Sequence, residues 1–312
     1  MIKRTALAMP LLLIACGLHL DSSNQTSTGI TCLETVGASR KACFAWNSFT
    51  PMTVAMAAGS KSEITVVTHS TVAAVSSTQP TVATVSLLNG TVQVTGGQPG
   101  STDLVLLDSS NTEIDRTTLQ VVSTEGLEPK VGSQASPVLV LEHTTQTFQV
   151  ATLGPGGVHT VGVGAVHFSL SGTAHQAFTI IGPVGDAVAF IGDVGDGSIV
   201  ATADQATAQL DVRFVPVTAL TSLSAQLASL QPNGDGTAQA HVAVTPMTAQ
   251  GPLYGTSCSW TTSDPSIHVL NPGVDLLDGP PGVEADFTLS HPGNFSVTCS
   301  LGSQSATAAI AY

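Results

Sequence analysis

The residues most suited to metal chemistry are histidines in a glycine-rich part of the chain. His159, His167 and His175 recur at intervals of eight. If His159 and His167 lie on adjoining strands, their imidazoles suit a zinc site. No cysteine or close carboxylate completes the set, and a site needs three or four convergent ligands. We therefore expect scattered exposed histidines and no bound metal.

Aspartates form a second candidate site. Asp186, Asp193 and Asp196 lie within GDAVAFIGDVGDG and supply the oxygen ligands that calcium prefers. An EF-hand loop would also need acidic or amide residues at alternating positions and a later glutamate, which are absent. Gly-Asp and Asp-Gly pairs also simply make turns. Calcium stays an open alternative to our expectation that the protein has no cofactor.

Aromatic residues gather once in a chain that contains few of them. Phe44, Trp46 and Phe49 lie in CFAWNSF, next to Arg40 and Lys41. Exposed aromatic side chains beside basic ones can bind a sugar or a protein partner. The alternative is that they close one end of a folded core, because aromatic side chains bury much area. These three residues are the candidate binding residues.

Local signatures of enzymes are missing from the sequence. It contains no Gly-x-Ser-x-Gly, His-Glu-x-x-His, Cys-x-x-Cys or Gly-x-x-x-x-Gly-Lys motif. We predict no catalytic residues and a protein that is not an enzyme. A site assembled from distant loop residues, as in a hydrolase or a carbohydrate-binding accessory protein, is the alternative.

Composition narrows the fold class. Charged residues make up 9% of the chain and aromatic residues 4%, while small and β-branched residues dominate. This composition favours many short β-strands over amphipathic helices. The net charge of −13 would repel nucleic acid, so no nucleic-acid partner is expected.

Residues 62–122 alternate apolar and polar positions in short runs separated by turn residues, among them Asn89-Gly90, which is a strong hairpin signal. The stretch 77–106 resembles the group 2 bacterial immunoglobulin-like domains. The matching residues are Pro80, Val82, Ala83, Val85, Gly90, Val92, Val94, Pro99, Gly100 and Leu104. The resemblance implies a β-sandwich.

Two further blocks follow. Residues 217–312 echo the pattern more loosely, and within them residues 258–270, CSWTTSDPSIHVL, resemble a segment of the same family. The middle of residues 127–216 is glycine-rich and matches no family pattern closely, so this block is expected to be a diverged immunoglobulin-like sandwich. Cys258 and Trp260 would share one face of a strand, with Trp260 in the core. We infer a disulfide from strand C, or the residue before it, to strand F. Residues 125–129 and 215–217 are the expected linkers.

The amino-terminal residues carry a targeting signal. Lys3 and Arg4 precede an apolar run, 6–15, that is too short to span a bilayer, as in a secretory signal peptide. Residues 13–16, LIAC, resemble the lipobox of bacterial lipoproteins. The resemblance implies cleavage before Cys16, lipidation of Cys16 with palmitate among its acyl chains, and a lipid anchor in the membrane.

Residues 16–30 read as a flexible tether of small polar residues. Gly17 after the lipidated cysteine implies the bacterial outer membrane, with either a surface-exposed or a periplasm-facing orientation. Apart from Cys16, four cysteines remain, an even number that suggests two disulfides in an exported chain. Sequence proximity proposes Cys32 with Cys43 and Cys258 with Cys299, although other pairings are possible.

Together these features predict an all-β chain of tandem immunoglobulin-like sandwiches after a lipoprotein signal peptide and a short tether. The expected parts are a signal peptide (1–15), the tether (16–30) and domains at 31–124, 125–216 and 217–312. The predicted function is a non-catalytic envelope lipoprotein that acts as a stalk, adhesion or protein-binding module, with an unknown protein or glycan partner. A periplasmic structural subunit of an envelope complex is the main alternative.

Overall fold

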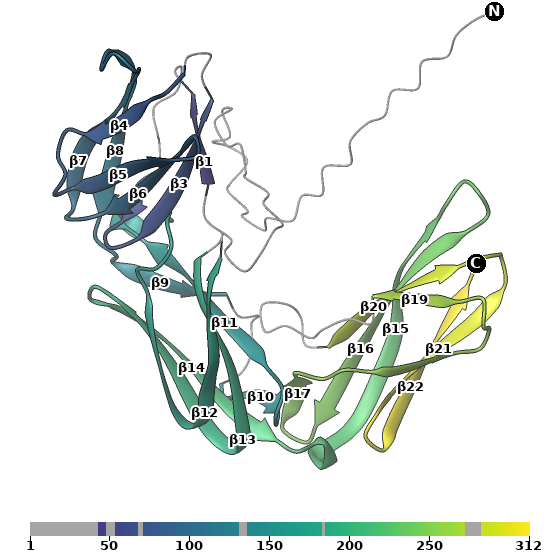
Figure 1. Cartoon of the computed structure of the whole chain (residues 1–312). Helices are drawn as coiled ribbons and strands as arrows, with labels where there is room; N and C mark the ends of the chain where they lie inside the picture. The colour runs from purple at the N-terminus through teal and green to yellow at the C-terminus, as the bar shows by residue number, and fades with distance from the viewer. Residues whose placement is uncertain (1–42, 48–53, 68–70, 131–135, 183–184, 272–281) are drawn as a thin grey trace, which may run out of the picture.

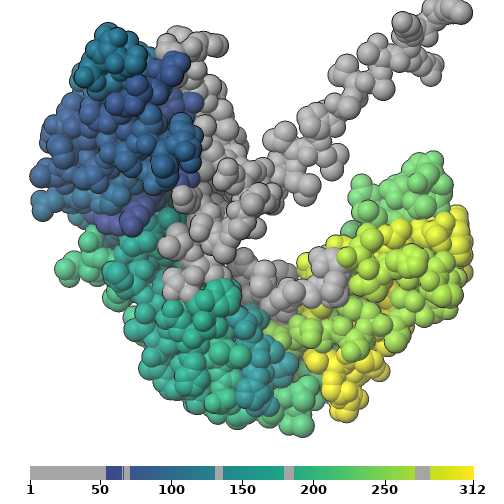
Figure 2. All heavy atoms as spheres, in the orientation of Figure 1, coloured from purple at the N-terminus to yellow at the C-terminus, as the bar shows by residue number. Residues whose placement is uncertain are grey.

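The structure, a computed structural model, describes residues 43–47, 54–67, 71–130, 136–182, 185–271 and 282–312 (Figure 1). Within this part of the chain, helical backbone is confined to the 3-10 turns η1 (Pro155–Gly157) and η2 (Val217–Ala219). No helix found there has the length and apolar character to cross a bilayer. The predicted all-β class is confirmed, because the strands form consecutive sandwiches, which Figure 2 shows as successive lobes.

The first sandwich contains β1 (Cys43–Asn47), β2 (Met56–Ala57), β3 (Lys61–Val67), β4 (Ala74–Ser77), β5 (Ala83–Leu88), β6 (Thr91–Gly96), β7 (Gly100–Leu107) and β8 (Glu113–Val122). One sheet has the order β1-β3-β6-β5 and the other β2-β8-β7-β4. Strands β3, β6 and β5 thus correspond to B, E and D of an immunoglobulin-like sandwich, and β4, β7 and β8 to C, F and G.

Alternation in the sequence accounts for this core. Val92 and Val94 on β6 point inward and are buried, as is Ile64 on the neighbouring strand β3. Asn89 and Gly90, between β5 and β6, both have positive φ (51° and 78°), as a type I′ turn requires. The predicted hairpin is therefore confirmed.

The second sandwich contains β9 (Gly126–Pro129), β10 (Val138–Leu141), β11 (Gln146–Leu153), β12 (His167–Gly182), β13 (Gly185–Ala203) and β14 (Ala206–Val215). Residues 186–190 of β13 pair with β11, residues 195–203 pair with β14, and β12 follows β13 along both stretches. One bent hairpin thus serves two sheets. Residues 126–129, which the sequence suggested as a linker, instead form β9 and pair with β11.

The bend in β13 depends on a glycine. Gly192 lies against the ring of Phe214, and a Cβ there would overlap the ring. Phe214 packs edge-on against Phe190 with ring centroids 6.2 Å apart, and both are fully buried together with Phe148. The aromatic rings of this otherwise aromatic-poor chain therefore fill the core of the second sandwich.

The third sandwich contains β15 (Leu220–Pro232), β16 (Ala238–Thr248), β17 (Gly251–Tyr254), β18 (Ser259–Thr262), β19 (His268–Asn271), β20 (Val283–Leu289), β21 (Asn294–Leu301) and β22 (Gln304–Ala311). The pairings β15-β16-β20-β19 and β18-β21-β22 reproduce the ABED and CFG sheets of an immunoglobulin constant-type domain.

The disulfide of the third sandwich is confirmed. Cys258, directly before β18, is bonded to Cys299 on β21, with 5.2 Å between the Cα atoms. Trp260 lies two residues further on, is half-buried and packs against the same core. Its ring meets Phe287 edge-on at 5.2 Å, so Trp260 contributes to the core as expected.

The second and third sandwiches share a continuous sheet. Strand β17 pairs in antiparallel fashion with β16 and in parallel fashion with β10. Its Tyr254 is fully buried in the core of the second sandwich, and its Leu253 packs with Leu139 and Leu220 at the junction. A segment from the third block of sequence therefore completes the second core.

The first and second sandwiches are joined by backbone hydrogen bonds. The Lys61 amide donates to the carbonyl of Val163 (2.7 Å), and the Val163 amide donates back (2.9 Å). Ala57 donates to Val161 (3.1 Å). Gly162, between these contacts, has a φ of +100° and lies directly against Ser60. The glycine-rich segment that matched no family pattern thus forms an interdomain connection.

Candidate functional site

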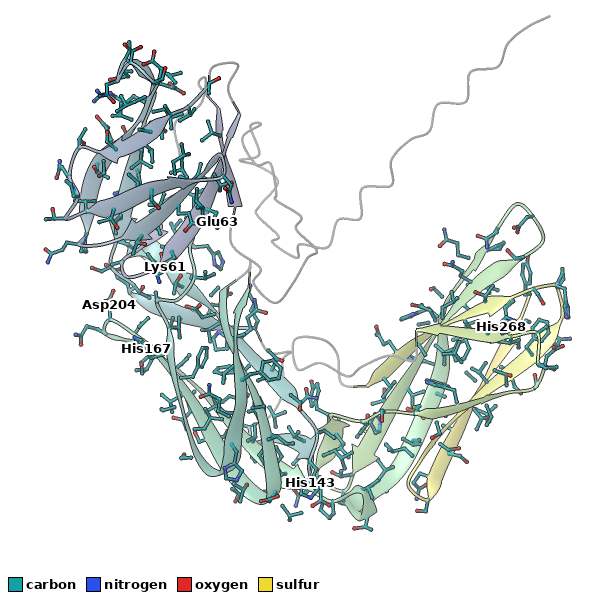
Figure 3. All side chains as sticks on the ribbon, in the orientation of Figure 1. Lys61, Glu63, His143, His167, Asp204 and His268 are labelled. Atoms are coloured by element: carbon teal, nitrogen blue, oxygen red, sulfur yellow. A yellow bond between two sulfur atoms is a disulfide. The ribbon has the colours of Figure 1, made fainter. Side chains whose placement is uncertain are left out.

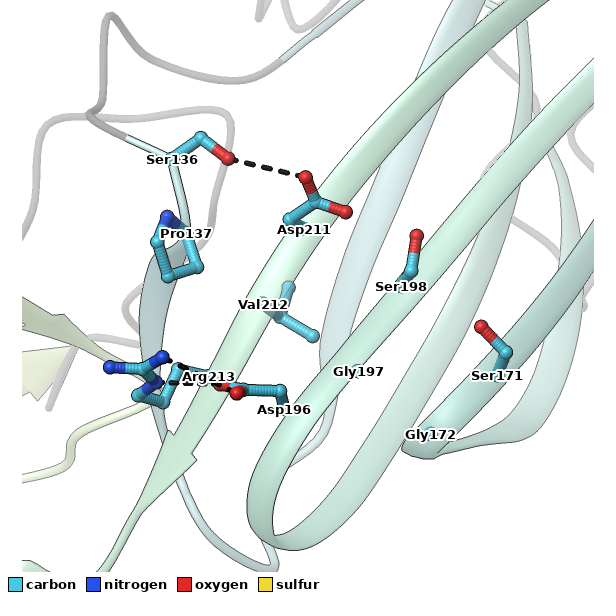
Figure 4. Close-up of a pocket in the computed structure, with 10 residues that line it drawn as sticks. All are labelled: Ser136, Pro137, Ser171, Gly172, Asp196, Gly197, Ser198, Asp211, Val212 and Arg213. Atoms are coloured by element: carbon cyan, nitrogen blue, oxygen red, sulfur yellow. Dashed lines mark hydrogen bonds and ion pairs between the residues drawn. The ribbon is translucent and has the colours of Figure 1, made fainter.

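An open groove of about 560 Å³ lies on the second sandwich (Figure 4). The strand register positions its polar side chains, because Ser171 on β12 is opposite Ser198 on β13, which is opposite Asp211 on β14. Ser136, just before β10, donates a 3.4 Å hydrogen bond to Asp211. A row of hydroxyl and carboxylate groups thus crosses adjacent strands.

An ion pair borders this row. The Arg213 guanidinium donates to both oxygens of Asp196, with Nε at 2.6 Å and Nη2 at 3.3 Å. These hydrogen bonds lower the pKa of the Asp196 carboxyl and raise the pKa of Arg213. Because both side chains are exposed, the pair orients the groove rim and adds little stability.

The groove offers hydrogen-bonding groups to a ligand. Ser198 Oγ is buried and has no hydrogen-bond partner among the described residues. The lining contains serines, aspartates and one arginine, but no histidine or cysteine. Such a surface can accept and donate hydrogen bonds to a polar ligand. The serine–carboxylate contact between Ser136 and Asp211 in this groove includes no histidine to relay a proton.

The structure separates the candidate histidines. His159 lies in the segment before β12, 3.4 Å from Glu128, and not on a strand adjoining that of His167, which was the arrangement that a zinc site would need. His167 begins β12, and His175 is exposed further along it. In the described ranges, no group of three or more His, Cys, Asp or Glu side chains is arranged to hold a metal ion.

The three candidate calcium ligands all lie on β13, each with its own partner. Asp186 is buried and accepts hydrogen bonds from the amides of Gly164 (2.6 Å) and Val166 (2.9 Å). Burial raises its pKa, against the effect of these donors. Asp193 lies 3.4 Å from His143, and Asp196 pairs with Arg213. Asp186 therefore anchors the interdomain segment, and calcium binding stays an untested alternative to the prediction of no cofactor.

A histidine–carboxylate cluster that sequence reasoning missed lies on the third sandwich. His241 on β16 is 2.8 Å from Asp286 and 3.3 Å from Glu284, both on the paired strand β20. The hydrogen bond to Asp286 is the main cause of a raised His241 pKa. No local motif could reveal this cluster, because His241 is more than 40 positions from both carboxylates.

Several predicted sites lie outside the described residues. These are Cys16, Cys32 and Phe49, and with them the proposed lipidation and the proposed Cys32–Cys43 disulfide. Cys43, Phe44 and Trp46 lie on β1, which pairs in parallel with β3. Only the backbone of β1 is described, so a binding role for Phe44 and Trp46 stays a prediction.

Comparison with protein families gives one match. Residues 52–122 match the model described as the pilus formation protein N terminal region. This range corresponds to β2–β8, the main part of the first sandwich, and to a minority of the chain. No curated protein sequence is significantly similar to the chain.

Among solved structures, similar chains include domains 4–9 of the surface layer protein SbsC (14% identity, TM-score 0.32), with 78% of this chain and 40% of that chain covered. The adhesin FdeC of Escherichia coli has 17% identity and a TM-score of 0.25, with 82% and 94% covered. Invasin, described as a bacterial integrin-binding protein, has 13% identity and a TM-score of 0.28, with 83% and 58% covered.

Proposed function

We propose that the protein is a non-catalytic arm of the bacterial cell envelope, anchored by lipid at Cys16 and displayed at the cell surface for adhesion or protein binding. The observation that carries this proposal is the way the sandwiches are joined. The first and second sandwiches are joined by backbone hydrogen bonds. The second and third are joined by strand pairing and by shared core residues. Joined in this way, the sandwiches hold a distal surface at a fixed distance and orientation.

The anchor is supported by the sequence. Lys3 and Arg4, the short apolar run and LIAC fit a lipoprotein signal, and the polar tether follows it. A cysteine bearing two or more acyl chains anchors stably, whereas a single chain does not. The first sandwich would then be held near the membrane, with the others extending from it.

The groove of the second sandwich supports a binding role. Its serines, Asp211 and the Asp196–Arg213 pair offer hydrogen bonds to a polar ligand. The candidate aromatics Phe44, Trp46 and Phe49 are a second proposed contact surface, for a protein or glycan. Because the groove offers hydrogen-bonding groups, binding is the activity that we propose for it.

Metabolic labelling with an alkyne palmitate analogue tests the anchor. We expect the full chain to incorporate the label and to fractionate with outer membranes. The Cys16→Ala variant should lose both properties, whereas Cys43→Ala should keep both. An unlabelled wild-type chain, or a Cys16→Ala chain that keeps the label and the membrane, would overturn lipidation at Cys16.

A second candidate is a periplasmic structural subunit of an envelope complex. It is favoured by the match of residues 52–122 to the pilus formation family. In this alternative the first sandwich docks against other components of the complex, and the chain faces inward. Partners should then co-purify after cross-linking, and removal of residues 52–122 should release them.

A further inference from the structure

Strand β12 leaves a long sheet edge open. It has 16 residues and, among the described strands, pairs only with β13. The edge strands β4, β9, β18 and β19 have four residues each, and β15, which pairs only with β16, has 13 and ends in a proline. Natural proteins protect sheet edges by keeping them short, by adding charged residues or proline, or by bulges. Because β12 is long, only charged residues, proline or bulges could protect it.

Charge and proline do not protect β12. Its sequence, HFSLSGTAHQAFTIIG, contains no Asp, Glu, Lys, Arg or Pro. Bulges protect only part of it, because its register against β13 shifts between Gly172 and Ala174 and again between Gln176 and Phe178. Gly172 also has a φ of +70°. Regular pairing therefore covers residues 167–172 and, beyond the second shift, residues 178–182. The first run is the longer, and its residues 167–171 precede the positive φ of Gly172.

Apolar side chains at this edge are incompletely covered. Phe168 and Leu170 point inward and pack against the core of the second sandwich, yet each is only half-buried. Phe168 meets Phe148 edge-on at 6.2 Å. The alternating residues His167, Ser169 and Ser171 are exposed on the outer face. One more strand along this edge would cover the apolar pair and pair with the open backbone.

We infer that this strand is supplied by β12 of a second copy of the chain, in antiparallel register about a two-fold axis at Ser169. Ser169 is the centre of the regular run 167–171. A two-fold axis perpendicular to the sheet keeps the inner and outer faces of both copies aligned, and it makes the interface isologous. The edge thus becomes a dimerisation surface.

This register is complementary at every position. Phe168 would be opposite Leu170 of the partner copy on the core side, a pairing of aromatic and aliphatic side chains that stabilises antiparallel sheets. On the outer face Ser169 would meet its own copy, and His167 would meet Ser171. No like charges are opposed. This matters because two chains with a net charge of −13 repel wherever their carboxylates approach.

Disulfide trapping tests the register directly. The full-length Ser169→Cys protein is oxidised, and its covalent dimer is measured on non-reducing gels. The protein also carries Cys16→Ser, so that a lipid anchor does not concentrate the copies on a membrane. Directly opposite residues have Cβ atoms about 4.5–5.5 Å apart, within reach of a disulfide. Ser171→Cys is the matched control. It is equally exposed on the same strand, but the register places it about 13 Å along the strand from its own copy.

We expect Ser169→Cys to form at least about five times more covalent dimer than Ser171→Cys, because only the first pair is opposite across antiparallel strands. A mixture of His167→Cys and Ser171→Cys chains should cross-link as heterodimers. Equal yields from Ser169→Cys and Ser171→Cys, or no dimer from either, would overturn the proposal. So would trapping of Ser169→Cys with a different protein when the oxidation is repeated in cells.

A second measurement does not depend on cysteine chemistry. Ser169→Glu places two carboxylates opposite each other at the axis and should shift the monomer–dimer equilibrium in sedimentation toward monomer. Thr118→Glu, on a strand of the first sandwich, is the charge-matched control and should leave the equilibrium unchanged. Wild-type protein that sediments only as a monomer would contradict the inference. The inference is independent of the proposed anchor, because Cys16 is absent from the trapped chain.

Discussion

At the scale of single residues, Tyr254 shows how the second and third sandwiches depend on each other. It lies on β17, in the third block of sequence, but is fully buried in the second core. Tyr254→Ala should destabilise the chain by about 3–5 kcal/mol, as expected when a large buried aromatic is truncated. Urea unfolding followed by tryptophan fluorescence and circular dichroism would measure this loss.

Tyr254→Phe is the control, because it keeps the buried ring and should change the free energy of unfolding far less than Tyr254→Ala does. If Tyr254→Ala unfolded at the same urea concentration as the wild type, β17 would not belong to the second core.

His241 gives a prediction for pH. Its pKa is raised in the folded protein, chiefly by the hydrogen bond to Asp286. The stabilisation is therefore fully present below its unfolded pKa of about 6.5 and is lost as pH rises through the folded pKa. Between pH 5 and pH 8 the wild type should lose stability relative to His241→Gln. The change should be below about 1 kcal/mol because the pair is partly exposed.

Urea midpoints at both pH values measure the effect, with His175→Gln as a control for the loss of an exposed imidazole. An unchanged difference between His241→Gln and the wild type at pH 5 and pH 8 would show that the cluster does not couple to folding.

Residue-level prediction succeeded where local patterns carried the information. Asn89-Gly90 indicated its turn, and the spacing of Cys258 and Trp260 indicated a shared face. It did not anticipate the groove around Ser198. The groove forms from strand register, since Ser171, Ser198 and Asp211 become neighbours only when β12, β13 and β14 pair.

At the scale of elements, the glycine-rich segment between η1 and β12 is the connection to the first sandwich. Gly162 has a positive φ and no room for a Cβ beside Ser60, so Gly162→Ala should loosen this junction. The amides of Lys61 and Val163 each donate to the carbonyl of the other residue across the junction. Their hydrogen exchange should accelerate by about 10-fold or more, because the variant adds strain of about 1–3 kcal/mol.

Gly156→Ala is the matched control for this experiment. Gly156 also has a positive φ, but no atom lies within 4 Å of the place that a Cβ would take, so this variant shares the backbone strain without the clash. Equal acceleration at Lys61 and Val163 in both variants would mean that the contact with Ser60 does not hold the junction.

The Cys258–Cys299 disulfide is a second connection between elements. It joins the start of β18 to β21 within one sheet of the third sandwich. Replacing Cys258 and Cys299 together by alanine should cost about 2–4 kcal/mol, the usual contribution of a disulfide. Differential scanning calorimetry should show a lower melting temperature for the double variant. A melting curve identical to that of the wild type would show that the bond adds no stability.

Element-level prediction was accurate for the first and third sandwiches, where alternation and turn residues agree with the strand order. It failed at 126–129, which form β9, and at β17, which joins two sandwiches. Both are short strands whose partners are distant in sequence. Periodicity within a strand reports which residues are buried, but it does not report which sheet receives them.

At the scale of the whole molecule, the sandwiches are linked in series, with an interdomain segment held by Asp186 and a sheet that continues from the second sandwich into the third (Figure 3). Lys61 and Asp204, labelled in Figure 3, mark the first junction, where Asp204 accepts a 2.8 Å hydrogen bond from the Thr124 amide. Connections of this kind suit the proposed arm, because they would hold its distal surface at a fixed position relative to the membrane.

Protease shaving of intact cells tests the surface display of this arm most directly. An epitope is placed after Tyr312, and a periplasmic protein serves as the control for envelope integrity. We predict that the epitope is lost while the periplasmic control survives, as the proposed display of the arm outside the cell requires. Protection of the epitope in intact cells, with loss only after the outer membrane is permeabilised, would contradict surface display and favour the periplasmic subunit.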